Sequence, residues 1–438
     1  MVLIRTALAL VTFAGCGQSL FDSRGDNDGD GDGGTDGPIA SSCPAGCIGD
    51  AATDFDGSPT GSTGRWRYLD DRRTREWTPM TATDNVFIGS DPRTKITTCI
   101  DEPTAAACSQ LAGALLVSSG GATSAADPAL EYTVETSDVI QLTLRVHVPS
   151  GTSAQIVRIY RNSREDVLAT ATAMPGVTLD RAITLDALAG DRFLVALAPD
   201  AMGASSVAVQ LFVNRTGAVF PSRCQLALNF SAATGNTVDN LCGADFTYGD
   251  YSQMPEPVPP VLAAGPFVEH GQAGDITVNH YYKGTDLLDR TGDTTIQMWV
   301  KHDALVDPYG AWIVSDEDLN SGGGLGAVIY DAGGSVQSLD VVTCTCTGPP
   351  CNMPTFAIKT VAYPMDQAWH FLRITHTGGM VNICIDGRKV GDLAVPATDL
   401  VSTFAPRLGR NVVWNPAGAY FDGALDDVRA FTTALPCE

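Results

Sequence analysis

The stretch that decides the fold lies near the end of the chain, where residues 369–387 read WHFLRITHTGGMVNICIDG and residues 421–431 read FDGALDDVRAF. In the first stretch, Val381, Ile383 and Ile385 alternate with polar or small residues. A two-residue period places the three apolar side chains on one face of an extended chain. This segment is therefore predicted to be a β-strand with one buried face.

The strand is followed by a turn signal. Asp386-Gly387 supplies two residue types that tolerate positive φ, which a two-residue hairpin turn requires. Met380–Ile385 and Arg388–Leu393 are therefore predicted to form a tight β-hairpin.

Strand-like alternation extends through much of the chain. It recurs in residues 296–300 and 370–376, whereas helical periodicity is hard to find beyond the N-terminus. The chain contains 45 glycines and 25 prolines, and only 18% of its residues are charged. This composition suits short strands joined by many turns. We therefore expect an all-β protein with two β-sandwich domains in tandem, and its length is sufficient to give each a sizeable core.

The order of four motifs carries a family resemblance: Trp369-His370, Asp386-Gly387, Leu408-Gly409-Arg410 and the terminal FDGALDDVR. This order resembles the closing half of a laminin-G-like jelly roll of the concanavalin A type. Residues 292–300, GDTTIQMWV, are similar to an earlier strand of that family. The resemblance implies a jelly roll over residues 223–438. It also implies binding before catalysis, because the fold serves mainly in recognition and as a scaffold.

Residues 49–222 are expected to form the first β-sandwich, an accessory domain, with the boundary near Pro221. The predicted strands are Val139–Val148, Gln155–Arg161, Val177–Leu185, Arg192–Ala198 and Ser205–Val213. Trp66, Tyr68 and Trp77 either form a sugar-stacking platform or, in the preferred interpretation, plug the end of the core. In the second domain, Met254–Pro266 is interpreted as a surface loop.

The N-terminus contains an export signal. Arg5 begins a cationic region, Ala7–Ala14 is an apolar run too short to span a bilayer, and Phe13-Ala14-Gly15-Cys16 resembles a bacterial lipoprotein signal. The resemblance implies removal of residues 1–15 and acylation of Cys16. The protein is then anchored in the bacterial cell envelope, at the outer membrane or cell surface. The alternative is an ordinary secretory signal with an incidental cysteine.

Residues 16–48 are expected to form a disordered tether. Residues 26–37 read DNDGDGDGGTDG, too polar to bury apolar surface and self-repelling. The run also imitates the start of an EF-hand loop. Its twelfth position is Gly37 rather than the chelating Glu, so a solvated linker is the preferred interpretation.

The charge and the missing motifs exclude several functions. A net charge of −23 without a basic stripe argues against nucleic-acid binding. The sequence lacks the Gly-x-Ser-x-Gly, His-Glu-x-x-His and phosphate-loop patterns, and the Glu-x-Asp-x-x-Glu carboxylate pattern of glycosidases on this kind of sandwich. We therefore predict that the protein is not an enzyme. His370 is interpreted as a packed or hydrogen-bonded strand residue, and His376 as a solvated residue near a hairpin tip.

Twelve cysteines in an exported chain indicate disulfides rather than zinc. Short spacings predict the pairs Cys43–Cys47, Cys99–Cys108 and Cys224–Cys242. The partners of Cys344, Cys346, Cys351, Cys384 and Cys437 cannot be assigned from the sequence. Acylation of Cys16 leaves an odd number, so one cysteine should be free or intermolecular.

Two sets of residues are candidates for binding. Tyr309, Trp312, Tyr330 and Trp414 lie near predicted loops of the second domain and could line a glycan or peptide surface; the alternative is that they belong to its core.

The second set, Asp293, Asp422 and Asp426, supplies hard oxygens near strand ends that suit calcium, which certain jelly rolls of the resembled family bind. The alternative is structural, with Asp426 accepting backbone N–H bonds or pairing with Arg429.

Together these observations favour a non-catalytic envelope lipoprotein that binds carbohydrate through its laminin-G-like jelly roll. The alternative is a structural or adhesive surface module that binds an envelope or surface protein and has no sugar site. Because a fold does not determine a function, the choice between a polysaccharide and a protein partner depends on the site itself.

The anchoring prediction is tested by Cys16→Ser. The substitution should leave the folded domains intact yet abolish partitioning into detergent, because stable membrane attachment depends on the acyl chains. The measurement is fractionation of the parent and variant proteins between membrane and soluble material. Equal membrane attachment of the two proteins would contradict the lipoprotein interpretation.

Overall fold

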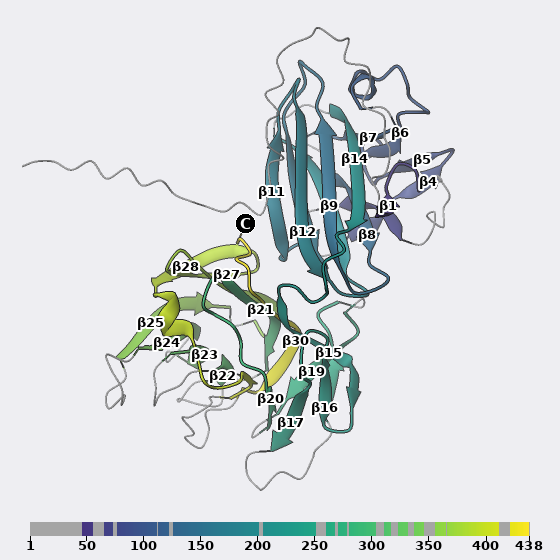
Figure 1. Cartoon of the computed structure of the whole chain (residues 1–438). Helices are drawn as coiled ribbons and strands as arrows, with labels where there is room; N and C mark the ends of the chain where they lie inside the picture. The colour runs from purple at the N-terminus through teal and green to yellow at the C-terminus, as the bar shows by residue number, and fades with distance from the viewer. Residues whose placement is uncertain are drawn as a thin grey trace, which may run out of the picture.

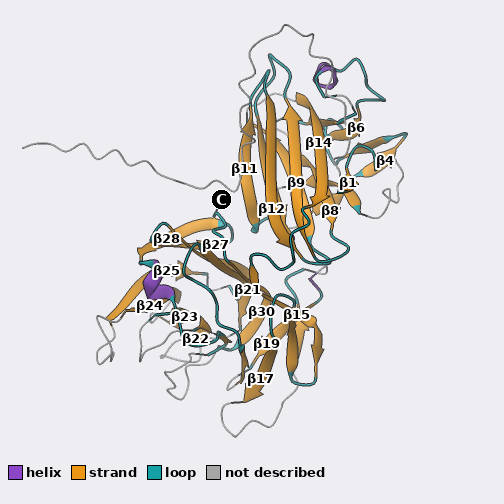
Figure 2. Ribbon diagram, in the orientation of Figure 1, coloured by secondary structure: helices purple, strands orange, loops and turns teal. Residues whose placement is uncertain are grey.

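The structure is a computed structural model that describes residues 46–437 except 56–64, 73–76, 112, 122–125, 201–204, 251–259, 268–269, 278–279, 304–310, 317–322, 332–336, 346–354, 365 and 411–420. The predicted signal, Cys16 and most of the predicted tether lie outside the described residues. Figure 2 shows that the regular secondary structure of the described part is almost entirely strand, joined by loops and turns, with short 3₁₀ segments such as η1 (Ala106–Ser109) and η3 (Ala397–Leu400). The predicted all-β class is confirmed. No helix in the described ranges has the length and apolar character needed to cross a bilayer.

The first domain is a sandwich of two antiparallel sheets. One sheet has the order β12-β9-β14-β7-β6-β5-β4, with β1 paired to β14, and the other has the order β11-β10-β13-β8-β2-β3. The strands are β1 (Cys47–Asp50), β2 (Trp66–Asp71), β3 (Trp77–Pro79), β4 (Thr81–Thr83), β5 (Val86–Ile88), β6 (Lys95–Thr98), β7 (Leu115–Ser119), β8 (Asp127–Thr133), β9 (Asp138–His147), β10 (Gln155–Arg161), β11 (Val167–Ala173), β12 (Thr178–Ala187), β13 (Arg192–Pro199) and β14 (Ser205–Arg215).

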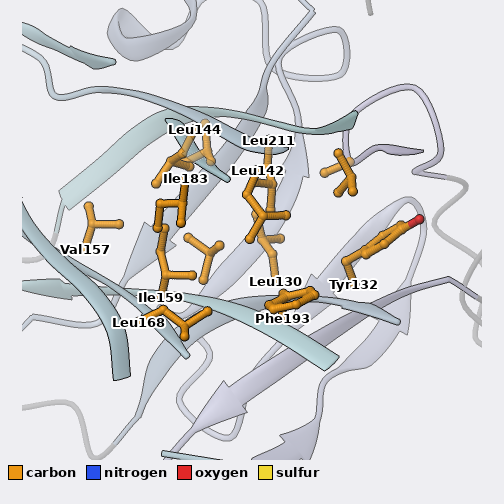
Figure 3. Packing of buried hydrophobic residues seen from close by; sticks show 14 of the residues in the cluster. Leu130, Tyr132, Leu142, Leu144, Val157, Ile159, Leu168, Ile183, Phe193 and Leu211 are labelled. Carbon is orange, nitrogen blue, oxygen red and sulfur yellow. The ribbon is translucent and has the colours of Figure 1, made fainter. Parts of the chain in front are cut away.

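Alternating side chains from the two sheets meet in the core of the first domain. Figure 3 shows Leu142 and Leu211 from one sheet facing Leu130, Ile159 and Phe193 from the other. Full burial of each such side chain contributes about 1.5–3 kcal/mol to folding.

The aromatic residues of β2 belong to the same core. Trp66 and Tyr68 are 1% and 3% exposed and lie within the buried cluster. The interpretation as core residues is confirmed for Trp66 and Tyr68, whereas Trp77 packs with Tyr160 against a separate cluster.

The second domain consists of two layers connected through one shared strand. The strand order is β25-β24-β23-β22-β29-β20-β17-β16-β15-β30-β21-β26-β27-β28, and β19 pairs with both β18 and β30. The strands are β15 (Cys224–Thr234), β16 (Thr237–Asn240), β17 (Phe246–Asp250), β18 (Val261–Ala264), β19 (Gln272–Ile276), β20 (His280–Lys283), β21 (Thr294–His302), β22 (Ala311–Ser315), β23 (Leu325–Asp331), β24 (Gln337–Thr345), β25 (Thr355–Tyr363), β26 (His370–Thr377), β27 (Met380–Ile385), β28 (Arg388–Ala394), β29 (Arg407–Leu408) and β30 (Gly423–Phe431). Strand β15 passes from one layer to the other because it pairs with β30 near its start and with β16 further along. Figure 1 shows the two domains as separate lobes, the first purple to teal and the second green to yellow.

The predicted hairpin is confirmed. Strands β27 and β28 pair across Asp386 and Gly387, whose φ values are 51° and 78°. Asp386 also accepts a hydrogen bond from His370 Nδ1 at 2.7 Å, and Asp366 contacts Nε2 of the same ring at 2.8 Å. Burial lowers the pKa of His370, but the two carboxylates outweigh it, so the net shift is upward. His370 is thus a hydrogen-bonded strand residue, as interpreted from the sequence.

The structure contradicts two interpretations made from the sequence. His376 is only 4% exposed, and its Nε2 lies 3.0 Å from the carbonyl oxygen of Val395. It shares the inward face of β26 with Leu372 and Ile374, so its strand position outweighs its closeness to the hairpin tip. The Pro-rich Met254–Pro266 segment is not all loop either, because it contains β18, which pairs with β19.

The connection between the domains is held by one carboxylate. Asp186, near the end of β12, accepts hydrogen bonds from the backbone N–H groups of Ser222, Arg223 and Cys224 and from Ser222 Oγ, at 2.5–2.9 Å. These bonds fix the chain at the point where it enters β15.

The C-terminal tail extends the first domain's core. Phe431 and Leu435 are 5% and 7% exposed and pack into the cluster that fills the first sandwich. Thr375 Oγ1 donates to the carbonyl oxygen of Leu435 at 3.0 Å. The C-terminal tail, from the last residue of β30 onward, therefore packs between the two domains.

A buried ion cluster lies beside this tail. Arg373 of β26 pairs with Asp166 of the first domain, and Arg161 Nε donates to the same carboxylate at 2.8 Å. Gln297 Nε2 donates to it at 3.0 Å, while the Arg161 guanidinium lies 4.7 Å from the centroid of the Phe431 ring. Burial alone would raise the pKa of Asp166, but Arg161 and Arg373 hold it below its ordinary value.

Two of the three predicted disulfides are confirmed: Cys99–Cys108 and Cys224–Cys242 are bonded. Cys384–Cys437 is a further bond, which ties β27 to the C-terminal tail. Cys47 is also disulfide-bonded, and its predicted partner Cys43 lies outside the described residues.

The disulfides should differ in their contribution to stability. The Cys384–Cys437 bond closes a separation of 53 residues and Cys99–Cys108 one of 9. In the chain-entropy model these loops are worth about 4 and about 2.5 kcal/mol. The double variant Cys384→Ser/Cys437→Ser should therefore lose more free energy of unfolding in urea than Cys99→Ser/Cys108→Ser. Equal losses, or free thiols at these positions in the parent, would contradict the assignment.

Candidate functional site

A β-bulge in β30 brings two consecutive carboxylates to one place. Arg429 pairs with Gln297 and Asp426 pairs with Trp299, so two residues of β30 oppose one residue of β21. Within this bulge, Asp427 has a φ of 46°, the left-handed region that a residue other than glycine adopts at a cost of about 1–3 kcal/mol. Consecutive strand residues ordinarily point to opposite faces, but a bulge redirects one of them. Asp426 and Asp427 consequently line the same cleft.

The cleft lies between the two domains and has a volume of about 200 Å³. Its lining is mostly polar and comes from both domains. The first domain contributes Asn162, Leu188, Ala189, Gly190, Asp191 and Arg192, and the second contributes Ala227, Leu228, Asn229, Phe230, Ser231, Leu241, His270, Gln272, Asp426, Asp427 and Arg429.

Arg429 is the central cation of the cleft. Its Nη1 and Nη2 donate to the two carboxylate oxygens of Asp191 at 3.0 and 2.7 Å, and its Nε donates to Asp427. Burial alone would raise the pKa of Asp191, but the guanidinium lowers it to about 2. This fork-to-fork pair joins the domains at the wall of the cleft.

His270 and Asp426 form a second pair. His270 Nδ1 lies 3.0 Å from Asp426 Oδ2, and both side chains are less than a tenth exposed. The ring packs against Phe267 and Trp299, and its Nε2 is a buried atom with no hydrogen-bond partner in the structure as described. Burial raises the pKa of Asp426, and the bond from His270 only partly offsets this.

The structural alternative for Asp426 is therefore half correct. Asp426 accepts the backbone N–H of Asp427 at 2.8 Å, as expected. Its side-chain partner is His270, however, whereas Arg429 pairs with Asp191 and Asp427.

The rim of the cleft carries amide and hydroxyl groups. Ser231 and Gln272 are exposed, and Asn229 is half-buried. Ser231 Oγ accepts the backbone N–H of Gln272 at 3.1 Å, which places the two residues side by side. Such groups both donate and accept hydrogen bonds, the combination that a hydroxyl-rich ligand needs.

The three calcium candidates do not lie together. Asp293 precedes β21 and Asp422 precedes β30, and His302 at the far end of β21 pairs with Gly423. Nine strand residues separate the two ends, about 30 Å at 3.3 Å per residue. Asp426 lies between them and is held by His270.

Asp422 has acidic neighbours instead. Burial and the nearby charge of Asp303 raise its pKa, and burial with Asp303 and Asp422 raises that of Asp275. Among residues 46–437 with the gaps given above, no group of three or more His, Cys, Asp or Glu side chains is arranged to hold a metal ion.

The aromatic candidates are also dispersed. Trp312 is 4% exposed and packs with Val328, Val342 and Tyr330, on the face of the sheet opposite the main core. Tyr330 is half-buried at the edge of this cluster. A buried Trp312 cannot offer a ring face to a ligand in this conformation. Tyr309 and Trp414 lie outside the described residues.

Sequence reasoning missed Asp191, His270 and Arg429 as members of one site. In the sequence, Gly190-Asp191 directly precedes the predicted strand Arg192–Ala198, and Arg429 belongs to the terminal motif. Their proximity had no local signal, because 238 residues separate Asp191 from Arg429.

Comparisons with known proteins agree with this architecture. Residues 273–438 match the family model of the concanavalin A-like lectin/glucanases superfamily, which confirms the resemblance for that part of the chain. No curated protein matches the chain.

Three similar solved structures have low scores. Domain 4 of an extracellular arabinanase from Geobacillus stearothermophilus, in complex with arabinotriose, has a TM-score of 0.35 and 16% identity over 49% of this chain and 94% of that one. A CBM22 tandem domain from Paenibacillus barcinonensis has a TM-score of 0.24 and 11% identity over 86% and 95%. Domains LG4-5 of the mouse laminin alpha1 chain have 0.25 and 12% over 68% and 84%. Scores this low support no statement about ligand or activity.

The Arg429–Asp191 ion pair between the domains should be essential to stability. Arg429→Met leaves Asp191 buried and uncompensated, which typically costs about 3–5 kcal/mol. Arg93→Met, which breaks an exposed pair with Asp91, is the control and should leave the free energy of unfolding unchanged. Chemical unfolding of the three proteins measures the difference, and a loss for Arg429→Met as small as that of the control would contradict the assigned role.

The same pair predicts a pH dependence. Because the folded pKa of Asp191 is about 2, below its unfolded value of about 3.9, its contribution is present above pH ~4 and lost as the pH falls through ~2. The stability difference between the parent and Asp191→Asn should shrink over that range. A difference that stays constant would show that the carboxylate is not charged in the pair.

Proposed function

We propose that the C-terminal domain, whose residues 273–438 belong to the concanavalin A-like lectin/glucanases superfamily, binds carbohydrate without catalysis and holds a sugar unit in the interdomain cleft. The observation that carries the proposal is the cleft itself: a concave polar site of about 200 Å³ to which both domains contribute. Domain interfaces are common places for small-ligand sites.

The rim chemistry supports a sugar. Asn229, Ser231 and Gln272 offer donors and acceptors side by side, and Asp427 adds a carboxylate oxygen. Sugar hydroxyls both donate and accept, so they can satisfy such a mixed rim, whereas a purely apolar ligand would strip water from these groups without replacing it.

The partners of the carboxylates support binding rather than hydrolysis. Glycoside hydrolysis requires an acid and a second carboxylate that are free to flank the scissile bond. In the cleft Asp191 is engaged by Arg429, and Asp426 by His270 and a backbone N–H. These contacts hold the carboxylates in the wall of the site. Asp191 and Asp426 are therefore not a free pair that could transfer protons to and from a glycosidic bond.

We further propose the setting in which this binding occurs. Acylation of Cys16 and the acidic segment 16–48 would hold the two domains at a distance from the envelope membrane. Calcium is proposed as an accessory ligand at the Asp422 end of β30, outside the cleft. Comparing thermal melts with and without calcium tests this part separately.

One observation favours the rival function, adhesion to a protein. Phe356 and Ile358 are 45% and 49% exposed on β25, which ends the strand order of its sheet. An exposed apolar edge strand is a place where another chain can add a strand or pack.

The test is a glycan array probed with the Cys16→Ser chain, followed by calorimetric titration of any glycan that binds. Saturable binding of a defined glycan, with no release of product, is expected. Absence of binding to every glycan, together with saturable binding to an envelope protein, would reject the carbohydrate proposal in favour of the rival.

A further inference from the structure

The charged residues that line the cleft restrict the charge of the ligand that it can bind. Its walls hold three carboxylates, Asp191, Asp426 and Asp427, and two guanidinium groups, Arg192 and Arg429. The formal balance is therefore one negative charge (two minus three), with His270 taken as neutral. A ligand meets this field at close range, where water screens it poorly.

Both cations are already committed to protein oxygens. All three nitrogens of Arg429 donate to Asp191 or Asp427, and the side chain is only 8% exposed. Arg192 Nη2 donates to the carbonyl oxygen of Asn162 at 2.9 Å, and its Nη1 lies 3.5 Å from buried Glu131. Recognition of an anionic group depends on a free fork of N–H donors, which neither arginine offers.

The hydrogen-bonding capacity that remains lies in acceptors on Asp426 and Asp427, because Asp191 already accepts from Arg429, from Asn162 Nδ2 and from the backbone N–H of Leu188. Asp426 accepts the backbone N–H of Asp427 through Oδ1 and contacts His270 Nδ1 through Oδ2, which uses two of the roughly four lone-pair positions of a carboxylate. His270 Nε2 is a buried atom without a hydrogen-bond partner in the part of the chain that the structure describes. The bulge places Asp427 in the same lining despite an unfavourable φ, and Asp427 Oδ1 accepts from Arg429 Nε. The carboxylate oxygens of Asp426 and Asp427 in the lining thus favour N–H and O–H donors on a ligand.

Size limits the ligand as well. A cleft of about 200 Å³ is below the roughly 300–1,000 Å³ typical of sites for drug-sized ligands. It accommodates one small unit, such as a single sugar ring at the end of a chain.

Resting on the proposed function, we infer that the interdomain cleft selects a neutral or basic sugar unit and rejects an acidic one. A hydroxyl or ammonium group supplies the donors that the carboxylate-rich wall can accept. A uronate carboxylate or a sulfate supplies only acceptors and meets net repulsion without a free arginine.

The experiment is calorimetric titration of the Cys16→Ser chain, at pH 7.5 and low salt, with the methyl glycosides of glucose, galactose, glucosamine, glucuronic acid and galacturonic acid. Each uronide should bind at least tenfold more weakly than the neutral glycoside of the same configuration, and the glucosaminide at least as tightly as the glucoside. The gap should narrow at high salt. Uronides that bind as well as their neutral counterparts would overturn the inference while leaving carbohydrate binding intact. Failure of all five glycosides and of the glycan array would reject both.

Charge variants assign the selectivity to the cleft. Gln272→Lys adds a cation at the exposed rim and should reduce the neutral-to-acidic preference at least threefold, whereas Asn229→Asp should increase it. Gln110→Lys makes the same change at an exposed residue beside η1, away from the cleft lining, and should leave the preference unchanged. Equal effects of the two lysine variants would show that selectivity comes from the overall charge of the chain and would overturn the assignment to the cleft.

Discussion

Two arginines of the second domain, Arg373 and Arg429, are buried against Asp166 and Asp191 of the first domain, and the relative placement of the two sandwiches depends on them. Burying a charge is unfavourable unless a partner is fixed in good geometry, so each pair tolerates only a narrow range of domain orientations. Apolar contacts of the tail, such as Phe431 in the first core, add attraction without direction. The ion pairs fix the orientation of one domain relative to the other, and the cleft depends on that orientation.

The closing strand β30 has several structural roles at once. On one side it pairs with β21 from Gly423 to Phe431, and on the other side its early residues pair with β19 and its last residues with β15. The bulge at Asp427 interrupts this regular pairing. A locally strained residue persists only when its surroundings over-determine it, and here Arg429 binds Asp427 from two residues further along the strand. The same bulge directs Arg429 toward the first domain and Asp426 toward His270.

Local patterns in the sequence were enough to predict much of the fold. The hairpin at Asp386-Gly387, the five strands predicted for the first domain and the Cys99–Cys108 bond depend on residues that are neighbours along the chain. The site depends on contacts that are not local. Asp191 and Arg429 meet across 238 residues, and Cys384 and Cys437 across 53. Periodicity identifies the apolar face of a strand, but it carries no information about which buried charge will find which partner in another domain. The bulge is similarly hidden, because Asp-Asp in a strand looks like one inward and one outward residue until the register is known.

Using one set of charges for two purposes constrains how the cleft can change. Asp191 and Arg429 join the domains and also form the wall that a ligand would meet. Replacing either one alters the electrostatic field of the cleft and leaves the other buried charge without compensation, so stability and selectivity would change together. The rim residues Asn229, Ser231 and Gln272 are uncharged, so replacing them removes no ion pair between the domains. Substitutions that change ligand preference and preserve the fold are therefore expected at the rim, while the charged residues of the wall stay the same.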